Sequence, residues 1–322
     1  MGFLYFFSVL FLYSFVCVYY VYTYRGNVRY DSTVEYFRKG WPIFTPFNCL
    51  LYMFTKKRAK KSILNMNDFT DLKVIEDNWE VISKEAQALH ANKYFDIVKD
   101  PDAKSYFDLG FRTFYKYGWS KFYLNWYGYT HKSALKHCPE TIKVLKKCKL
   151  VKGAMFSYLP PGGKLTRHQD PIACSLRYHL GLKTPNNDNC FINIDDQFYS
   201  WRDGKPLLFD ETYIHYANNN TDEDRIILMC EVARPMNILG SFLNLFYRVF
   251  MKFSVVPNLP GDRRGLFNFV FSSISPILGK TKNLKTTNNT LYKFIKYSVN
   301  TLLTVLLVYL FYGIFKLITY FF

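Results

Sequence analysis

Three residues of metal-binding type, His168, Asp170 and His215, are spaced so that they could share one metal ion. Two imidazoles and one carboxylate form a donor set that holds Fe(II) on one face and leaves positions open for a co-substrate and O2. Residues i and i+2 of a β-strand point to the same side, so His168 and Asp170 could face one metal. Arg225 begins an apolar stretch and is placed to offer its guanidinium to a carboxylate co-substrate.

Each of these residues also has an ordinary interpretation. An isolated H-x-D triplet is usually a surface or hydrogen-bonded pair, and a lone arginine is usually in a surface ion pair. Asp210 and Glu211 lie shortly before His215 and are competing carboxylates. As loop residues before a strand, we expect them to cap a turn or to be solvated. The metal hypothesis therefore depends on the surrounding sequence.

Several motifs surround these side chains. They are Ser157-Tyr-Leu-Pro-Pro-Gly-Gly, His168-Gln-Asp-Pro, Ser175-Leu-Arg-Tyr-His-Leu-Gly-Leu, Tyr199-Ser-Trp-Arg-Asp-Gly, Phe209-Asp-Glu-Thr-Tyr-Ile-His-Tyr and Arg225-Ile-Ile-Leu. Together they resemble the aspartyl/asparaginyl β-hydroxylase family of 2-oxoglutarate-dependent oxygenases. The closer resemblance is to its membrane-bound bacterial branch, the lipid A acyl-chain 2-hydroxylases, and it covers roughly residues 25–237.

The resemblance implies a role for each residue of the H-x-D…H pattern. His168, Asp170 and His215 would be the ligands of Fe(II), with 2-oxoglutarate and O2 as co-substrates. Asp170 matches the carboxylate of the lipid-hydroxylase branch, which the animal peptidyl hydroxylases lack at this position. The resemblance therefore favours a lipid over a peptide as the substrate.

The resemblance also implies a pocket for 2-oxoglutarate. Arg225 matches the arginine that pairs with the distal carboxylate of this co-substrate. Ser157, Arg177 and His179 match residues that line the same pocket. From the residues alone, Ser157 could equally be a turn hydroxyl and His179 a hydrogen-bonded core histidine.

The distribution of short apolar runs predicts a mainly β fold with flanking helices. Between residues 151 and 235 these runs are separated by turn signals such as Pro160-Pro-Gly-Gly and Asp203-Gly. Short strands at this spacing are typical of a jelly roll or barrel, and the double-stranded β-helix of the family agrees. Residues 119–126 alternate as a strand, and residues 69–91 have helical periodicity.

The charge balance restricts the class of partner. The chain has 42 Lys and Arg against 25 Asp and Glu, a formal net charge of +17, which favours a polyanionic partner. The sequence contains no zinc-finger, RNP or helix-turn-helix pattern, so we expect an anionic lipid and no nucleic acid. Seven scattered cysteines without a C-x-x-C pair predict free thiols, which suit a reducing compartment and ferrous iron.

Residues 3–24 and 301–322 are long apolar stretches. Each is long enough to provide the ~20 residues that cross a bilayer. A cleaved signal peptide is the alternative for the first stretch, but it lacks a basic start and a small-residue cleavage site. Arg25, Arg29 and Arg38 follow it, so the positive-inside rule predicts a catalytic body on the cytoplasmic side.

Two further segments are apolar but too short or too charged to span. Residues 40–65 combine a short apolar run with Lys56-Lys-Arg-Ala-Lys-Lys, which could lie among lipid phosphates or equally be a solvated run. Residues 238–259 carry Arg248 and Lys252, and charges inside a bilayer are costly. We therefore expect the second segment to lie in the membrane interface.

These observations predict an organisation and a function. The expected segments are an N-terminal transmembrane anchor (1–24), a basic juxtamembrane segment (25–66), an oxygenase jelly-roll domain (67–237), interfacial amphipathic segments (238–300) and a C-terminal transmembrane helix (301–322). The expected protein is an integral membrane dioxygenase, in an inner or cytoplasm-facing membrane, that hydroxylates an acyl chain of a lipid A-like, anionic, phosphorylated glycolipid. It would decarboxylate 2-oxoglutarate to succinate and CO2. The alternatives are a peptidyl aspartyl/asparaginyl hydroxylase and a membrane-anchored binding module without activity.

Overall fold

The computed structural model describes residues 2–108, 110 and 114–321, and in the last two helices it describes only part of the side chains. The chain divides into two compact units, Met1–Phe269 and Val270–Phe322. The first unit contains both sheets and all the candidate site residues.

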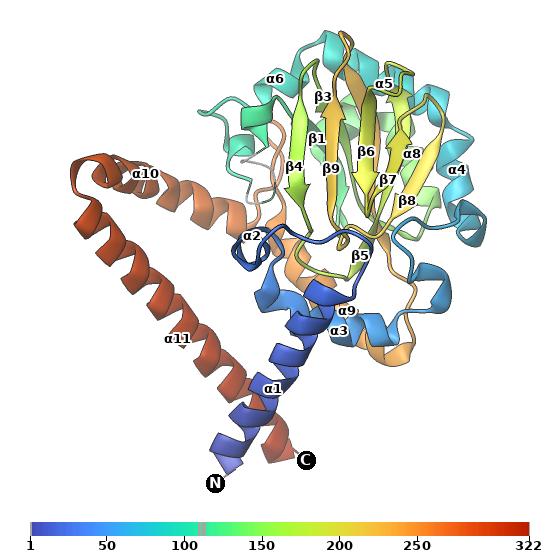
Figure 1. Ribbon diagram of the computed structural model, residues 1–322. Helices are drawn as coiled ribbons and strands as arrows, with labels where there is room; N and C mark the ends of the chain where they lie inside the picture. The colour runs from blue at the N-terminus through green and yellow to red at the C-terminus, as the bar shows by residue number, and fades with distance from the viewer. Residues whose placement is uncertain (1, 109, 111–113, 322) are drawn as a thin grey trace. The chain divides into compact units, whose positions relative to one another are not determined.

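In the described part of the chain, ten strands form two antiparallel sheets (Figure 1). The strands are β1 (Ser120–Trp126), β2 (Tyr129–Thr130), β3 (Val151–Leu159), β4 (Lys164–His168), β5 (Ser175–Lys183), β6 (Cys190–Ile194), β7 (Gln197–Ser200), β8 (Pro206–Phe209), β9 (His215–Asn219) and β10 (Arg225–Ala233). One sheet has the order β2-β1-β3-β10-β5-β8 and the other β4-β9-β6-β7. From β3 onward the chain passes repeatedly between the sheets, which is the arrangement of a jelly roll. The predicted mainly β fold is confirmed.

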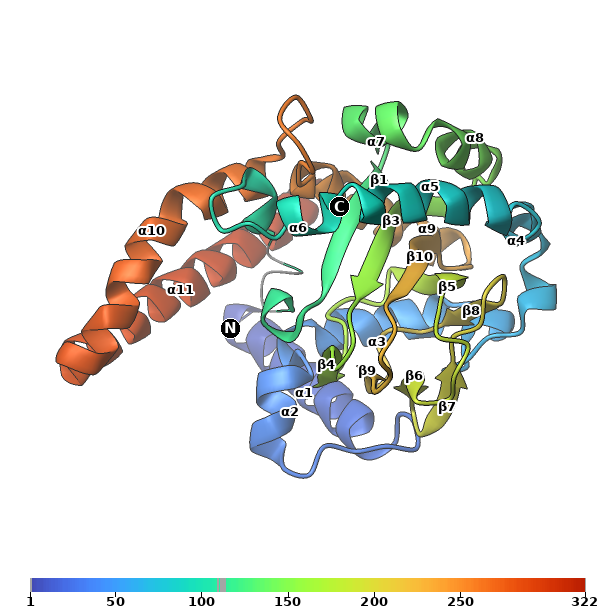
Figure 2. The ribbon, with the colours of Figure 1, turned by 90° about the horizontal axis from the view of Figure 1, so that it is seen from above.

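Helices cover the outer face of the larger sheet (Figure 2). They include α4 (Lys73–Glu76), α5 (Trp79–Ala91), α6 (Tyr94–Ile97), α7 (Lys132–His137) and α8 (Pro139–Lys147). The helix expected over residues 69–91 is therefore interrupted between α4 and α5. The side chain of Asn78 donates to the carbonyl of Val74 at 2.8 Å, and such local hydrogen bonds compete with helix continuation.

Strand alternation divides the apolar residues of the larger sheet between two cores. Ile226 and Leu228 of β10 pack outward against the helices, whereas Ile227 packs inward between the sheets. The same alternation turns the neighbouring residue Arg225 inward. The inner face of the sheet therefore mixes apolar residues with a few polar ones.

Four further helices lie at the end of the sandwich where β4 ends and β9 begins (Figure 1). This end contains His168, Asp170 and His215, here called the triad, and is called the triad end. The helices are α1 (Gly2–Thr23), α2 (Thr33–Lys39), α3 (Thr45–Phe54) and α9 (Ile238–Met251). The loop 169–174, which follows β4, is hydrogen-bonded to the last three of them. These bonds join Gln169 to Lys39, Asn48 to Pro171 and Ala173, and Asn244 to Cys174.

The membrane-spanning predictions are met in part. Among the described side chains, Tyr5–Thr23 of α1 is the one stretch long and apolar enough to cross a membrane. In the second unit, α10 (Leu266–Thr287), which begins in the first unit, is followed by α11 (Asn289–Phe321). The predicted C-terminal span, residues 301–322, falls on α11. Most side chains of that span lie outside the described residues, so it stays a prediction.

Candidate metal centre and co-substrate pocket

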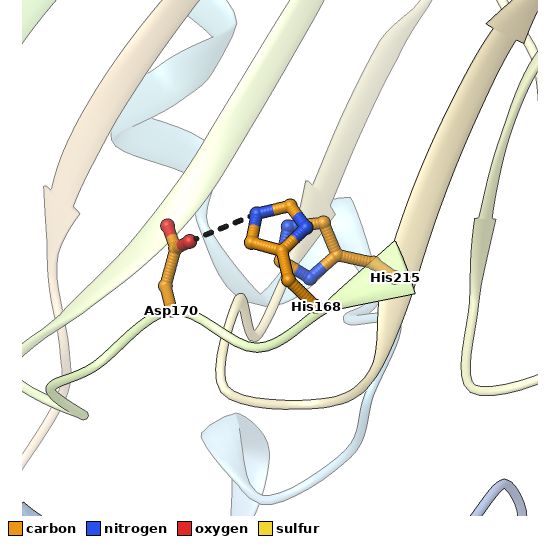
Figure 3. Close-up of side chains that lie close together, drawn as sticks. All are labelled: His168, Asp170 and His215. Atoms are coloured by element: carbon orange, nitrogen blue, oxygen red, sulfur yellow. Dashed lines mark ion pairs between the residues drawn. The ribbon is translucent and has the colours of Figure 1, made fainter. Parts of the chain in front are cut away.

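His168, Asp170 and His215 come together at the triad end (Figure 3). His168 is the last residue of β4, His215 is the first residue of β9, and the two are cross-strand partners. Their ring centroids are 4.3 Å apart. The H-x-D spacing predicted that Asp170 shares a strand with His168, and this is corrected: Asp170 lies in the loop two residues beyond the end of β4. One ligand atom from each of the three residues lies within 4.8 Å of the others, a separation that one metal ion could bridge.

Both histidines are oriented by their own backbone. His168 Nδ1 lies 2.8 Å from the carbonyl oxygen of Thr166, and His215 Nδ1 lies 2.9 Å from that of Tyr213. A carbonyl can only accept, so each Nδ1 carries a proton, which leaves Nε2 as the metal-binding atom of each ring. This is the usual second hydrogen bond of a metal-binding histidine.

The ionisation states of His215 and Asp170 suit metal binding. Burial, together with the neighbouring His168, lowers the pKa of His215 to about 4, so this imidazole is neutral at pH 7. Burial alone would raise the pKa of Asp170, but the hydrogen bond from His168 and the charge of Arg177 hold it below its usual range. A neutral imidazole and an ionised carboxylate are the ligand forms of these residues.

Arg177 connects Asp170 to two buried carboxylates. Its guanidinium lies 3.0 Å from Asp170, pairs with Glu211 and lies 3.7 Å from Glu231. The backbone N–H of Asp170 also donates to the carbonyl of Glu211 at 2.9 Å. The structure therefore places Arg177 beside the triad, where it holds one carboxylate oxygen of Asp170.

The expectation that Asp210 and Glu211 are capping or solvated residues is corrected in one respect. Asp210 does cap its turn, because it accepts from the N–H of Thr212 at 3.0 Å. Both carboxylates are nevertheless buried, since arginines from distant segments reach them: Arg25 and Arg234 contact Asp210, and Arg177 contacts Glu211. A local pattern could not reveal partners so far away in the sequence.

Arg225 is fully buried without an acidic partner among the described residues. Its Nη2 donates to Ser157 Oγ at 3.1 Å, whereas its Nε and Nη1 have no hydrogen-bond partner in the described structure. The guanidinium lies over the rings of Trp201 (4.5 Å) and Trp119 (5.2 Å). Burial lowers the pKa of Arg225 to about 10. A buried cation with two unused donors is suited to bind the carboxylate of a ligand.

Ser157 and His179 lie on the same inner face as Arg225. Ser157 Oγ also accepts from Trp119 Nε1 at 2.6 Å, so its own proton is free to be donated to a ligand. His179 packs against Trp201 and Phe209, and neither of its ring nitrogens has a partner in the described residues. Burial and the nearby Arg225 lower the pKa of His179 well below its usual value, so it is neutral.

The structure thus forms two groups from the seven residues singled out in the sequence. One contains His168, Asp170, His215 and Arg177, and the other contains Ser157, His179 and Arg225. Phe209 contacts both His179 and His215 and so links the groups. The indoles of Trp119 and Trp201 were not expected here. The available signals were the motif Tyr199-Ser-Trp-Arg-Asp-Gly for Trp201 and the predicted strand 119–126 for Trp119.

The chain has detectable relatives. Residues 76–235 match the sequence model of the family described as Aspartyl/Asparaginyl beta-hydroxylase. The ornithine lipid ester-linked acyl 2-hydroxylase of Rhizobium tropici is 37% identical over 127 residues, which cover 39% of this chain and 45% of that protein. The aspartyl/asparaginyl beta-hydroxylase of Homo sapiens is 29% identical over 174 residues, which cover 52% of this chain and 22% of that protein. The chain spans less than half the length of either relative.

Similarity to solved structures is low. An uncharacterized conserved protein with a double-stranded beta-helix domain from Klebsiella pneumoniae has a TM-score of 0.23 and 10% identity, covering 28% of this chain and 73% of that one. The family assignment therefore depends on the sequence match and not on this likeness. Through residues 76–235, which include all seven site residues, the chain belongs to the aspartyl/asparaginyl β-hydroxylase family.

Proposed function

We propose that this chain is a membrane-bound dioxygenase that uses Fe(II), 2-oxoglutarate and O2 to hydroxylate an acyl chain of a polar membrane lipid. One oxygen atom of O2 would enter a C–H bond of the acyl chain. The other would enter succinate as 2-oxoglutarate loses CO2. His168, Asp170 and His215 would hold the metal, and Arg225 would hold the far carboxylate of 2-oxoglutarate.

The donor set supports the metal. Two imidazoles and one ionised carboxylate converge, and each imidazole uses Nδ1 for a backbone carbonyl, which leaves Nε2 for the metal. This is the ligand set of non-haem Fe(II) oxygenases, with positions left open for a co-substrate. When bound, the ferrous centre with 2-oxoglutarate and O2 supplies the oxidation of a C–H bond that acid–base catalysis does not reach.

The second group of residues supports a dicarboxylate co-substrate. Arg225 Nε and Nη1 provide two N–H donors, and the Ser157 hydroxyl provides a third, in a site from which water is largely excluded. Neutral His179 adds a hydrogen-bonding group without adding charge. The indoles of Trp119 and Trp201 restrict the guanidinium to one orientation. The role of these residues is to bind and orient the co-substrate.

The observation that carries the substrate class is the position of the triad against the helices of the triad end. The loop that contains Asp170 is hydrogen-bonded to α2, α3 and α9. These helices and the adjoining turn expose large apolar side chains, among them Phe37, Ile43, Met53, Phe242 and Phe246. Clustered exposed apolar residues mark a surface that contacts a membrane or a partner. With α1 as a membrane anchor, this surface would bring the triad to the bilayer interface.

A triad at the bilayer interface could reach a carbon atom of a lipid acyl chain. The carbon beside the ester or amide carbonyl of a lipid lies close to the headgroup. The acyl chain would therefore have to move only a short distance out of the bilayer to reach the triad. The relative from Rhizobium tropici is named for acyl 2-hydroxylation of an ornithine lipid. The sequence motifs favoured a lipid A-like glycolipid, and both lipids have an acyl chain beside a polar headgroup. We place the catalytic body on the cytoplasmic side, from the basic residues after α1.

Mass spectrometry of lipids tests this function. The chain would be expressed in a Gram-negative host that makes both ornithine lipids and lipid A but lacks acyl 2-hydroxylation. We expect a lipid heavier by one oxygen atom, with the hydroxyl on an acyl chain, and none from His168→Ala expressed at the same level. The headgroup of the modified species would show which lipid is the substrate.

A reconstituted assay separates the alternatives. Protein in liposomes should release one succinate for each lipid hydroxylated. If an iron-loaded protein leaves every lipid unchanged but releases succinate with an Asp- or Asn-containing peptide, the peptidyl hydroxylase is correct. If the purified chain binds neither Fe(II) nor 2-oxoglutarate, the enzyme proposal fails and a binding module remains.

A further inference from the structure

A cavity of about 390 Å³ lies between α1, α3 and the turn that precedes β9. Its volume falls within the ~300–1,000 Å³ typical of small-molecule sites. Val16 and Tyr20 of α1 and Cys49 and Met53 of α3 form part of its wall. None of the triad residues lines this cavity, so it is separate from the metal centre.

The charged residues of the cavity are mainly basic. Arg25, Lys60 and Arg234 line it together with a single carboxylate, Asp210. Arg25 lies 3.0 Å from Asp210 and stacks between Tyr52 and Tyr213, and Arg234 lies 2.7 Å from the other oxygen of Asp210. Both guanidiniums are therefore already paired.

Lys60 differs from these two arginines. It is exposed, and the described structure gives its ammonium group no ion pair. It belongs to the short turn after α3, which also carries Lys56 and Lys57. A cavity with an apolar wall on one side and an unpaired ammonium on the other matches a molecule that has an apolar chain and an anionic head.

We propose that this cavity binds one anionic membrane lipid, with an acyl chain against Val16 and Met53 and the headgroup phosphate at Lys60. Residue Val16 belongs to Tyr5–Thr23, the stretch apolar enough to cross a bilayer, so the opening would face lipid. The inference rests on the part of the proposed function that places α1 in the membrane, and it does not depend on the hydroxylation reaction. The lipid site is a second site, distinct from the substrate position at the triad.

The cavity adjoins the backbone that orients the metal ligands. Asp210 and Tyr213 line the cavity, and backbone carbonyls of the same turn are hydrogen-bonded to two triad residues. The carbonyl of Glu211 accepts from the N–H of Asp170, and that of Tyr213 accepts from His215 Nδ1. A bound lipid would thus stabilise the turn to which both ligands are hydrogen-bonded.

Native mass spectrometry of the full chain tests the proposal. The protein would be extracted from nanodiscs that contain phosphatidylglycerol and phosphatidylcholine in equal amounts. We expect one retained phosphatidylglycerol per chain. Lys60→Glu should lower the retained fraction about fivefold or more, since each basic contact with anionic lipid is worth about 1 kcal/mol. Lys57→Glu is the matched control, because Lys57 is also exposed in the same basic run but does not line the cavity.

A second pair of variants tests the apolar wall. Val16→Trp should fill the cavity and abolish retention, whereas Val9→Trp should not, because Val9 lies two turns earlier on the same face of α1 and outside the cavity. Resistance to carbonate extraction would show that every variant is still inserted. Equal retention in Lys60→Glu and Lys57→Glu, or in Val16→Trp and Val9→Trp, would overturn the proposal. An inserted wild-type protein that retains no lipid would also overturn it, whatever the result of the hydroxylation assay.

Discussion

Arg225 is the residue at which stability and function oppose each other most clearly. Its guanidinium is buried between two indoles with one hydrogen bond and no carboxylate among the described residues. Burying a cation without its partner destabilises a fold, and burial here lowers the pKa of Arg225 to about 10. Ionised Arg225 therefore weakens the ligand-free protein at pH 7. A carboxylate ligand would remove this penalty.

We predict that Arg225→Met stabilises the ligand-free protein by about 1–3 kcal/mol, the usual penalty of unsatisfied buried polar groups. The same change should abolish stabilisation by 2-oxoglutarate. Arg225→Lys should raise the 2-oxoglutarate concentration needed, because a single ammonium cannot reproduce the two-pronged contact. Thermal unfolding with and without 2-oxoglutarate measures both effects. Arg202→Met, which removes a half-buried arginine that pairs with the exposed Asp188, is the control and should change neither.

His168→Ala and His215→Ala should each remove metal binding. Outer-shell changes reduce metal affinity by about 10- to 100-fold, and loss of a ligand should exceed that range. Titration calorimetry with Fe(II) under anaerobic conditions measures the affinity, and a chelator should abolish turnover of the unaltered protein. His137→Ala is the control: His137 is paired with Tyr94 and is not a site residue, so this variant should bind metal normally. Metal binding that survives in His215→Ala would refute the ligand set.

At the scale of single residues, the sequence predicts which side chains belong to the site better than it predicts which residues they contact. The H-x-D…H pattern predicted three candidate ligands, and the structure brings them together because β4 and β9 are neighbouring strands. It did not predict that Arg177 would pair with Asp170 and not simply line the co-substrate pocket. That pairing depends on Glu211 and Glu231, which come from other segments and share the same guanidinium.

At the scale of elements, the turn between β8 and β9 determines the geometry of the site. Asp210 anchors this turn through Arg234, which it meets with both carboxylate oxygens at 2.7 and 2.8 Å, and through Arg25. Burial alone would raise the pKa of Asp210, but the two arginines hold it well below the usual range. The stabilisation is therefore present above about pH 4 and is lost only as the pH falls through the lowered pKa.

Asp210→Asn should destabilise the protein by about 3–5 kcal/mol, because it leaves two buried guanidiniums without a counter-charge. Urea unfolding at pH 7 measures this loss. We also expect weaker Fe(II) binding in the fraction that still folds, since the turn holds both Asp170 and His215. Asp188→Asn removes an exposed ion pair with Arg202 and should leave the urea midpoint almost unchanged, because water screens the pair. Similar losses in the two variants would contradict the buried-anchor interpretation.

Elements were predictable where the pattern is local. The strand predicted over residues 119–126 from their alternation is found at Ser120–Trp126. The break at Asn78 was missed, because a side-chain hydrogen bond to Val74 competes with an otherwise continuous apolar face. The residues from Pro206 to Asn219 form two strands, β8 and β9, separated by the anchored turn.

At the scale of the whole molecule, composition indicated a membrane but not which surface faces it. The predicted interfacial segment after residue 238 folds as α9, a helix of 14 residues, which is too short to span a bilayer. Asn244 packs inward and donates to the carbonyl of Cys174 in the loop of the triad end. Phe242 and Phe246 lie on the opposite, exposed side. The direction of this face depends on tertiary packing, which periodicity alone does not determine.

We therefore predict that Phe242→Asp combined with Phe246→Asp lowers lipid turnover about tenfold or more without changing Fe(II) affinity. Each buried aromatic side chain contributes about 1.5–3 kcal/mol, and two charges would have to be dehydrated at the interface. Because α1 would keep the protein in the membrane, the loss should appear in turnover of lipid in vesicles. It should not appear with a short-chain, water-soluble acyl substrate. Phe198→Asp, on an exposed phenylalanine of β7, is the control. If the double variant lost activity equally on both substrates, α9 would support the fold and not the approach to the bilayer.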